Sequence, residues 1–199
     1  MNFLAHIYLS FNQAEVSLGN FIADHVKGKD YQEFSLGVQQ GILLHRAIDD
    51  FTDQHPLFRL SCKRIFGTQG HYSRVVIDIF YDYFLAAYWQ QHHPSELSVF
   101  ASDFYSLLQS QLDNMPKKTQ HLAPYMISQN WLLAYSTQAG IERILKGMHR
   151  RTSHASKMDK ALLDLQAHEP ALKADFDAFF PELIIFSRNK LSQLQTQSL

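Results

Sequence analysis

The sequence is poor in cysteine, glycine and proline, and it has no excess of either charge. A single cysteine, Cys62, excludes an internal disulfide and favours a reducing, cytoplasmic setting. Eight glycines and six prolines in 199 residues leave no flexible linker that would divide the chain. The formal net charge of −1 argues against a general nucleic-acid binder, since such proteins usually carry a basic excess.

Long apolar runs are also absent from the sequence. No segment approaches the length of a membrane span, and the opening MNFLAHIYLSF lacks the basic leader of a signal peptide. Hydrophobic residues make up 46% of the chain and charged residues 19%, which is typical of a globular protein. We therefore expect one domain over residues 1–199, with disorder only in the last few residues.

Hydrophobic residues recur at helical spacing along nearly the whole chain, and no alternating strand pattern or Asn-Gly hairpin is found. The fold class is therefore predicted to be all-α, as one compact helical domain. Pro56, Pro94 and Pro170 stand where helices should begin. The predicted helices cover residues 2–11, 14–27, 35–54, 57–66, 71–92, 95–113, 119–135, 138–150, 158–167 and 170–194.

The stretch GILLHRAIDDFTD, residues 41–53, places a histidine and two acids on one helical face. His45, Asp49 and Asp53 are spaced four residues apart, and the apolar residues between them predict an amphipathic core helix. A histidine and a carboxylate four residues apart can bind one divalent ion together, because their side chains converge over one turn. The alternative is a solvated face with a weak His–Asp pair.

The stretch VVIDIFYDYFL, residues 75–85, raises a different question. Asp78 and Asp82 lie among nine apolar or aromatic neighbours, and a helix that is apolar on every side is normally buried. A buried carboxylate needs a partner, either a hydrogen-bond donor, a cation or a metal. Arg74 could form a surface salt bridge with Asp78, but that order of charges is the less favourable one and leaves Asp82 without a local cation.

Further polar residues stand beside apolar helix faces near the start of the chain. Asn2 and His6 are four residues apart, and Asp24 follows the apolar part of GNFIAD. Helical bundles build metal sites from such residues on several helices, and a mixed set of histidines and carboxylates favours Mn, Fe, Zn or Mg over Ca. The residues that share this setting are Asn2, His6, Asp24, His45, Asp49, Asp78 and Asp82.

Six motifs, in the order MNFLAH, GNFIAD, GILLHRAIDDFTD, DIFYDYFL, WLLAY and GMHRR, resemble the acyl carrier protein phosphodiesterase family, also called acyl carrier protein hydrolase. The similarity runs from Met1 to about Pro181. That family is similar to the HD-domain phosphohydrolases, an all-helical, metal-dependent fold. The resemblance implies hydrolysis of holo-acyl carrier protein to the apo protein and 4′-phosphopantetheine, with Mn²⁺ or Mg²⁺.

The resemblance also assigns roles by position. Asp24 matches the aspartate of the GN-x-x-AD motif and is the first candidate for a catalytic residue, with His6 and His45 as candidates for proton transfer. The implied metal ligands are Asp24, His45, Asp49, Asp78, Asp82 and His6. The chain departs from the wider HD superfamily, because it has no adjacent His-Asp doublet: His45 is followed by Arg46. The metal scheme of that superfamily cannot be copied directly.

The chemistry of a phosphodiester explains why metal ligands are expected. A divalent ion offsets the negative charge that repels a nucleophile, and it lowers the pKa of a bound water. The attacking and leaving oxygens should lie roughly in line at phosphorus. Arg46 is a weaker candidate for contact with the phosphate, because it lies about 100° round the helix from His45.

A basic segment near the end of the chain suggests how an acidic partner could dock. Residues 143–160 contain six of the 18 Lys and Arg residues and one acid, Asp159. Lys146, Arg150 and Arg151 are the candidate contacts for the acidic acyl carrier protein; the alternative is a solvated helix end. Two other functions stay open: hydrolysis of a small phosphoester or nucleotide, and a non-catalytic helical module that binds an acidic partner.

Overall fold

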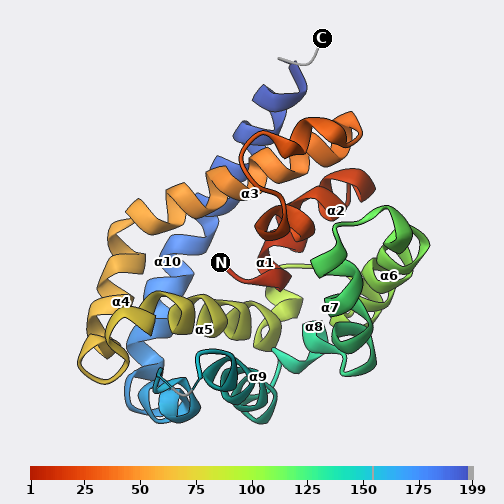
Figure 1. Ribbon diagram of the computed structural model, residues 1–199. Coiled ribbons are helices and arrows are strands. Elements are labelled where there is room, and N and C mark those ends of the chain that lie inside the picture. Colours follow the sequence, from red (N-terminus) through yellow and green to blue (C-terminus); the bar gives the residue numbers. More distant parts are fainter. Residues whose placement is uncertain (154, 197–199) are drawn as a thin grey trace.

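Three helices form the first part of the chain, and two of them carry the predicted site residues His6, His45 and Asp49. In the computed structural model, which describes residues 1–153 and 155–196, they are α1 (Phe3–Tyr8), α2 (Ala14–Ile22) and α3 (Leu36–Gln54). Two 3₁₀ turns, Ala23–His25 and Asp30–Glu33, connect α2 to α3. The short α1 packs against α2 on one side and against α5 (Ser73–Ala87) on the other, near the centre of Figure 1.

Helices α2 and α3 pack backbone against backbone, because each has a glycine where they cross. A Cβ atom added to Gly19 would lie 2.1 Å from the carbonyl oxygen of Val38, and one added to Gly41 would lie 2.2 Å from that of Val16. Only glycine, which has no Cβ atom, fits in these places. The close approach brings the polar residues that follow on the two helices next to each other.

The next two helices are α4 (Pro56–Gln69) and α5. Pro56 lies in the first turn of α4, as predicted, where its missing N–H breaks no helical hydrogen bond. In α5, most residues after Val75 are buried against α1, α4, α9 (Gln138–Arg151) and α10 (Ala161–Thr196). The interpretation of VVIDIFYDYFL as a buried helix is therefore confirmed, and its two aspartates are enclosed within the protein or at the edge of its core.

Helices α6 (Leu97–Ser110), α7 (Lys117–Ser128) and α8 (Trp131–Ala134) lie at the right of Figure 1, and α9 lies below α5 along its lower edge. The single helix predicted for residues 119–135 is wrong, because the chain breaks between α7 and α8. Asn130 adopts a left-handed conformation there, with φ of 45°, and its side-chain oxygen accepts a hydrogen bond from the backbone of Leu133. Asparagine tolerates this conformation better than most residues do.

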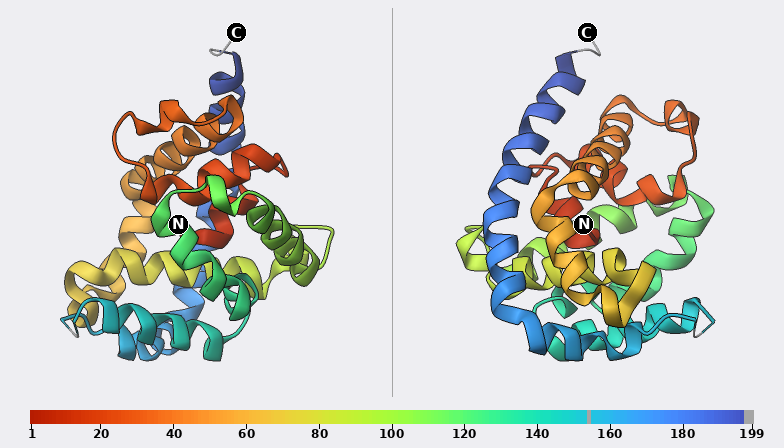
Figure 2. Two further views of the ribbon diagram at one scale, coloured as in Figure 1. Left: turned by 45° about the vertical axis from the view of Figure 1, so that its right-hand side comes forward. Right: turned by 90° about the vertical axis from the view of Figure 1, so that its left-hand side faces the viewer.

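The long helix α10 replaces two predicted helices, and Pro170 lies inside it rather than at the start of a new one. A proline inside a helix removes one hydrogen bond and strains the preceding turn. Packing of α10 against α3 and α4 outweighs the cost of the lost hydrogen bond, since Leu172, Phe176 and Phe179 are fully buried. Figure 2 shows that the first turns of α10 lie along one end of the molecule and that the rest rises steeply from them.

The described residues form a single compact helical domain, so the all-α prediction is confirmed. They are 83% helical and contain no strand. Among them, no helix combines the length and the apolar character needed to cross a bilayer. The remaining 3₁₀ turns are Gly70–Tyr72, Trp89–Gln91, Leu112–Asn114 and Met158–Lys160. The expected disorder at the very end of the chain concerns residues 197–199, which lie outside the described residues.

Candidate active site

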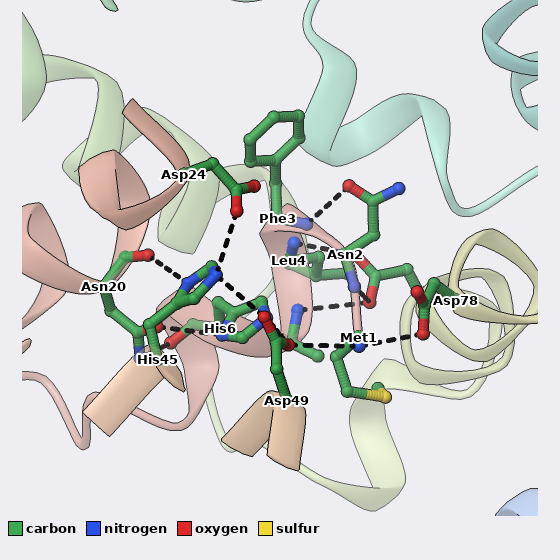
Figure 3. A network of polar contacts seen from close by, with 12 residues as sticks. Met1, Asn2, Phe3, Leu4, His6, Asn20, Asp24, His45, Asp49 and Asp78 are labelled. Atoms are coloured by element: carbon green, nitrogen blue, oxygen red, sulfur yellow. Dashed lines mark hydrogen bonds and ion pairs between the residues drawn. The ribbon is translucent and has the colours of Figure 1, made fainter. Parts of the chain in front are cut away.

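Two histidines and an aspartate from α1 and α3 converge beside the start of the chain. The rings of His6 and His45 are stacked, with centroids 3.8 Å apart and planes 15° from parallel. Asp49 lies beside both rings: its Oδ1 is 3.2 Å from His6 Nε2, and its Oδ2 is 3.1 Å from His45 Nε2. The ligand atoms of the three residues all lie within 4.8 Å of one another. Figure 3 shows how the three side chains point toward one another.

Asn20 of α2 orients both histidines. His6 Nδ1 lies 2.8 Å from Asn20 Oδ1, while Asn20 Nδ2 donates to the carbonyl oxygen of His6 at 2.7 Å. His45 Nδ1 lies 2.7 Å from the backbone carbonyl oxygen of Asn20. Because both atoms that face the rings are acceptors, each Nδ1 carries a hydrogen, and both Nε2 atoms point toward Asp49. Asn20 is not among the site residues predicted from the sequence. The signal for it in the sequence is a polar amide directly before the apolar residues of GNFIAD, and the structure buries it fully.

The charges in this cluster are unevenly distributed. Burial, together with the neighbouring His45, lowers the pKa of His6 to about 4. Burial also opposes protonation of His45, but contacts with Asp24 and Asp49 outweigh it and raise the pKa of His45 to about 9. Burial raises the pKa of Asp49, yet the neighbouring His45 and His6 hold that pKa below its usual range. His45 therefore carries a proton at neutral pH, whereas His6 does not.

Asp24 stands at the open side of the cluster. It belongs to the 3₁₀ turn Ala23–His25 that follows α2, and its Oδ1 lies 3.4 Å from His45 Nε2. The bond to His45 lowers the pKa of Asp24, against the opposing effect of burial. Because 70% of the Asp24 side chain is exposed, this carboxylate is the one most accessible to a substrate or to water.

The three converging residues fit a divalent metal ion. Two imidazole nitrogens and a carboxylate form a common ligand set for such ions. The buried Nε2 atom of His6 makes no hydrogen bond among the described residues, although Asp49 Oδ1 lies 3.2 Å away, because with the proton on Nδ1 both facing atoms are acceptors. A cation between the rings and Asp49 would give the His6 nitrogen a partner, provided that His45 gives up its Nε2 proton.

Asp78 lies beside the cluster and reaches it through the start of the chain. Its Oδ1 is 2.8 Å from the α-amino nitrogen of Met1, and the same nitrogen lies 3.8 Å from Asp49 Oδ1. Burial lowers the pKa of this amine, but Asp78 and Asp49 outweigh burial and raise it to about 10. Burial raises the pKa of Asp78. The structure thus pairs Asp78 with a cation, rather than bringing it into the group of converging ligand atoms.

Asp82 lies behind α1 and holds the start of that helix. It is fully buried, and its carboxylate accepts hydrogen bonds from the backbone N–H groups of Leu4 at 2.8 Å, Asn2 at 3.3 Å and Ala5 at 3.4 Å. Burial raises its pKa to about 7, against the effect of the amine and of these bonds. Asp82 is therefore not brought together with the metal-binding candidates, but it positions the helix that carries His6.

Two arginines have other partners than those considered from the sequence. Arg74 pairs with Asp53 at 2.8 Å and not with Asp78, and both partners line the cavity of about 310 Å³ that contains the cluster. Arg46 donates to the carbonyl oxygens of Gly28 at 2.8 Å and Val26 at 3.1 Å. It fixes the turn that follows Asp24 and does not line the cavity, whereas Arg74 does.

The predicted docking residues lie on α9, and they differ in their surroundings. Lys146 pairs with Glu142 at 2.7 Å. The guanidinium of Arg151 lies 5.8 Å from the centre of the Trp131 ring. Arg150 and Arg151 are exposed and line a second hollow that opens from the first, whereas Lys146 does not. Two residues of the basic segment therefore line a hollow that adjoins the cavity of the cluster.

Known sequences identify the family. Residues 1–183 match the profile that describes acyl carrier protein phosphodiesterases. The chain belongs to this family. Relatives named acyl carrier protein phosphodiesterase include a protein of Photorhabdus laumondii, 34% identical over 96% of both chains. Others are from Enterobacter sp. strain 638 and Escherichia coli strain HS, each 32% identical over 96% of this chain and 99% of the relative. No solved structure matches the chain.

Membership of the acyl carrier protein phosphodiesterase family makes the chain a phosphodiester hydrolase. Three of the motifs that carried the resemblance supply the cluster: MNFLAH contains His6, GNFIAD contains Asn20 and Asp24, and GILLHRAIDDFTD contains His45 and Asp49. The fold brings these motifs together at one cavity. The similarity to HD-domain phosphohydrolases stays a prediction.

Proposed function

We propose that this enzyme hydrolyses the phosphodiester bond between 4′-phosphopantetheine and the serine of holo-acyl carrier protein, with a divalent metal held by His6, His45 and Asp49. The observation that carries the proposal is the convergence of these three residues, with a buried imidazole nitrogen left unpaired, in a member of a phosphodiesterase family. When bound, the ion offsets the charge of the phosphodiester and lowers the pKa of water.

The ligand set favours Mn²⁺ over Mg²⁺ as the resident metal. Mg²⁺ prefers an all-oxygen shell, whereas imidazole nitrogen suits the transition metals. Two of the three converging ligands here are imidazoles. The site is also open to one side, where Asp24 is exposed, so substrate and water can reach it. Quantifying the metal in protein purified without added ions distinguishes Mn²⁺ from Zn²⁺ and Fe²⁺.

The residues around the cluster have separate tasks in this proposal. The carboxylate of Asp24, whose side chain is 70% exposed, accepts the proton of the attacking water, since a general base must reach the reacting atoms. The serine oxygen that leaves takes up a proton from solvent and becomes the serine hydroxyl of the apo protein. Asn20 holds the imidazoles in one tautomer. The guanidinium of Arg74 at the cavity edge can exchange its pairing with Asp53 for contact with the anionic phosphodiester.

The acidic carrier protein is proposed to dock near α9. Arg150 and Arg151 are exposed beside the opening of the site, and surface cations steer an acidic partner toward it. The cytoplasmic setting expected from the single cysteine is part of the same proposal.

The test is hydrolysis of purified holo-acyl carrier protein, followed by mass spectrometry as loss of the phosphopantetheine group. We expect chelator-treated enzyme to be inactive and Mn²⁺ to restore the rate. Full activity after chelation would disprove the metal-dependent mechanism. Activity on nucleotides or small phosphoesters, without activity on the carrier protein, would favour a small-substrate enzyme. Tight binding of the carrier protein without any hydrolysis, in the presence of metal, would favour a binding module.

A further inference from the structure

A second hollow, of about 910 Å³, opens from the cavity that contains the histidines. It runs between α7, α8 and α9, and we call it the α7–α9 groove. The two hollows have Met1, Asn2, Phe3, Asp24 and Asp78 in common. A ligand held in the α7–α9 groove can therefore extend directly to the cluster.

The lining of the α7–α9 groove is apolar at its inner side. Val75 of α5, Leu122 of α7, and Ile144 and Met148 of α9 contribute to it, and all four are half-buried. Beneath them Tyr135 is almost completely buried. Half-buried apolar side chains that face a hollow are the usual lining of a small-molecule site.

The outer edge of the groove is cationic. Lys118, Arg143, Arg150 and Arg151 line it, and all are exposed. On the α7 side, His25 Nδ1 lies 2.7 Å from the hydroxyl of Thr119, a buried residue. This bond connects α7 to the turn that carries Asp24, so it fixes the position of one wall of the groove relative to the catalytic cluster.

The chemistry of a phosphodiester limits what can enter this groove. The phosphorus of the proposed substrate carries two organic groups, a serine of a folded protein and the flexible pantetheine arm. Only the arm is narrow enough to enter a hollow of this size, which lies in the range of about 300 to 1,000 Å³ typical of small-ligand sites. The arm has a dimethyl-substituted carbon and two amides, which suit an apolar lining with polar groups at its edge.

We infer that the α7–α9 groove binds the pantetheine arm, with the phosphodiester at the shared residues Asn2, Phe3 and Asp24 and the thiol end along α9 toward Met148. This inference rests on the proposed function and adds the location of the arm to it. The carrier protein itself stays outside, against the cationic edge. The groove then selects substrates that carry the arm over simple phosphodiesters.

The experiment fills the groove and measures selectivity. Met148→Trp places a bulky ring among the apolar lining, and we expect it to lower kcat/KM for holo-acyl carrier protein, relative to bis(p-nitrophenyl) phosphate, by about tenfold or more. The matched control is Ile185→Trp, an exposed apolar position on α10 that does not line the groove. It should leave both rates as in the wild type. An unchanged ratio in Met148→Trp would overturn the inference.

A second measurement keeps the inference testable if Met148→Trp does not fold. Ile144→Ala and Met148→Ala remove lining atoms instead of adding them, and we expect free pantetheine to bind each of them about tenfold more weakly than it binds the wild type, by calorimetry. Equal affinity in all three proteins would place the arm elsewhere.

The binding assay also separates this inference from the proposed function. Free pantetheine contains no phosphodiester, so its binding does not require catalysis. Groove-dependent binding by a protein that fails to hydrolyse holo-acyl carrier protein would reject the proposed function alone. Hydrolysis of holo-acyl carrier protein with unchanged selectivity and unchanged pantetheine binding in the groove variants would reject the inference alone.

Discussion

Two buried polar networks lie on neighbouring helices, and only one of them is complete. Between α4, α5 and α10, Asp175 accepts hydrogen bonds from Ser61 Oγ at 2.9 Å and from Arg64 Nε at 3.0 Å. Ser61 Oγ also lies 2.9 Å from the hydroxyl of Tyr81. Within the described residues, none of the buried side-chain atoms of this network lacks a partner. Such a network holds helices together.

The cluster of His6, His45 and Asp49, by contrast, is an incomplete hydrogen-bond network. One buried imidazole nitrogen is unpaired, and the proton on His45 stands where a cation would bind. Most buried polar atoms in folded proteins are hydrogen-bonded, and this unpaired nitrogen belongs to a residue that lines the cavity. The comparison predicts that changes in the incomplete network affect catalysis more than stability, and that changes in the complete one do the opposite.

The largest effect is expected for Asp49→Asn. It removes the carboxylate that faces both histidines and should lower kcat/KM for holo-acyl carrier protein by more than about a hundredfold. The free energy of unfolding should change by less than about 1 kcal/mol, because the Asp49 side chain is 44% exposed. Steady-state kinetics and thermal melting of metal-free protein measure the two. Asp50→Asn, at an exposed position on the same helix, is the control, and an equally active Asp49→Asn enzyme would contradict the assignment.

A smaller effect is expected for Asn20→Ala. The substitution removes the amide that orients His6, while the backbone acceptor of His45 remains. Loss of a group that orients a metal ligand typically weakens metal binding by about 10- to 100-fold. Calorimetric titration with Mn²⁺ measures this affinity. Wild-type affinity in a folded Asn20→Ala protein would show that His6 needs no such support.

The pH dependence of metal binding tests the protonation of His45. Its pKa is raised to about 9, so a proton competes with the metal below that value. Mn²⁺ affinity should therefore rise about tenfold per pH unit from pH 7 and level off near pH 9. The proton on His45 stabilises the metal-free fold fully below pH 6.5, and this contribution is lost as pH rises through about 9. Affinity independent of pH would contradict the assigned charge state.

The smallest effect on catalysis is expected in the complete network. Asp175→Asn removes the charge that Arg64 faces and should lower the free energy of unfolding by about 2 kcal/mol. The rate at 25 °C should stay within about twofold of the wild type, since the network does not reach the site. Asp177→Asn, a half-exposed position on the same helix, is the control and should change stability by less than about 0.5 kcal/mol. A large loss of activity would mean that the two networks are coupled.

The sequence predicted the helical fold and part of the site because both depend on local spacing. His45 and Asp49 share a face of α3 at four-residue spacing, and the structure places them together. Asp53 shares that spacing, but its partner is Arg74, 21 residues away. Helical periodicity identifies the face of a residue and not the neighbour that the face meets.

Long-range contacts account for what the sequence could not predict. Asp82 binds the amide of Leu4, 78 residues earlier, and no local pattern indicates that pairing. Pro170 would normally begin a helix, but burial of α10 against α3 and α4 keeps one helix through it. Local preference is a weak guide where tertiary packing is strong.

The position of the cluster along the chain has a consequence for folding. Asn20 is 14 residues from His6 and 25 from His45, whereas Ser61 and Asp175 of the complete network are 114 residues apart. Contacts between nearby residues form with less loss of chain entropy than distant ones. During synthesis the helix pair α2 and α3, locked by its two glycines, can assemble before α10 has been made. The proposed metal ligands are then brought together early, and packing of α10 completes a protein in which these residues are already in place.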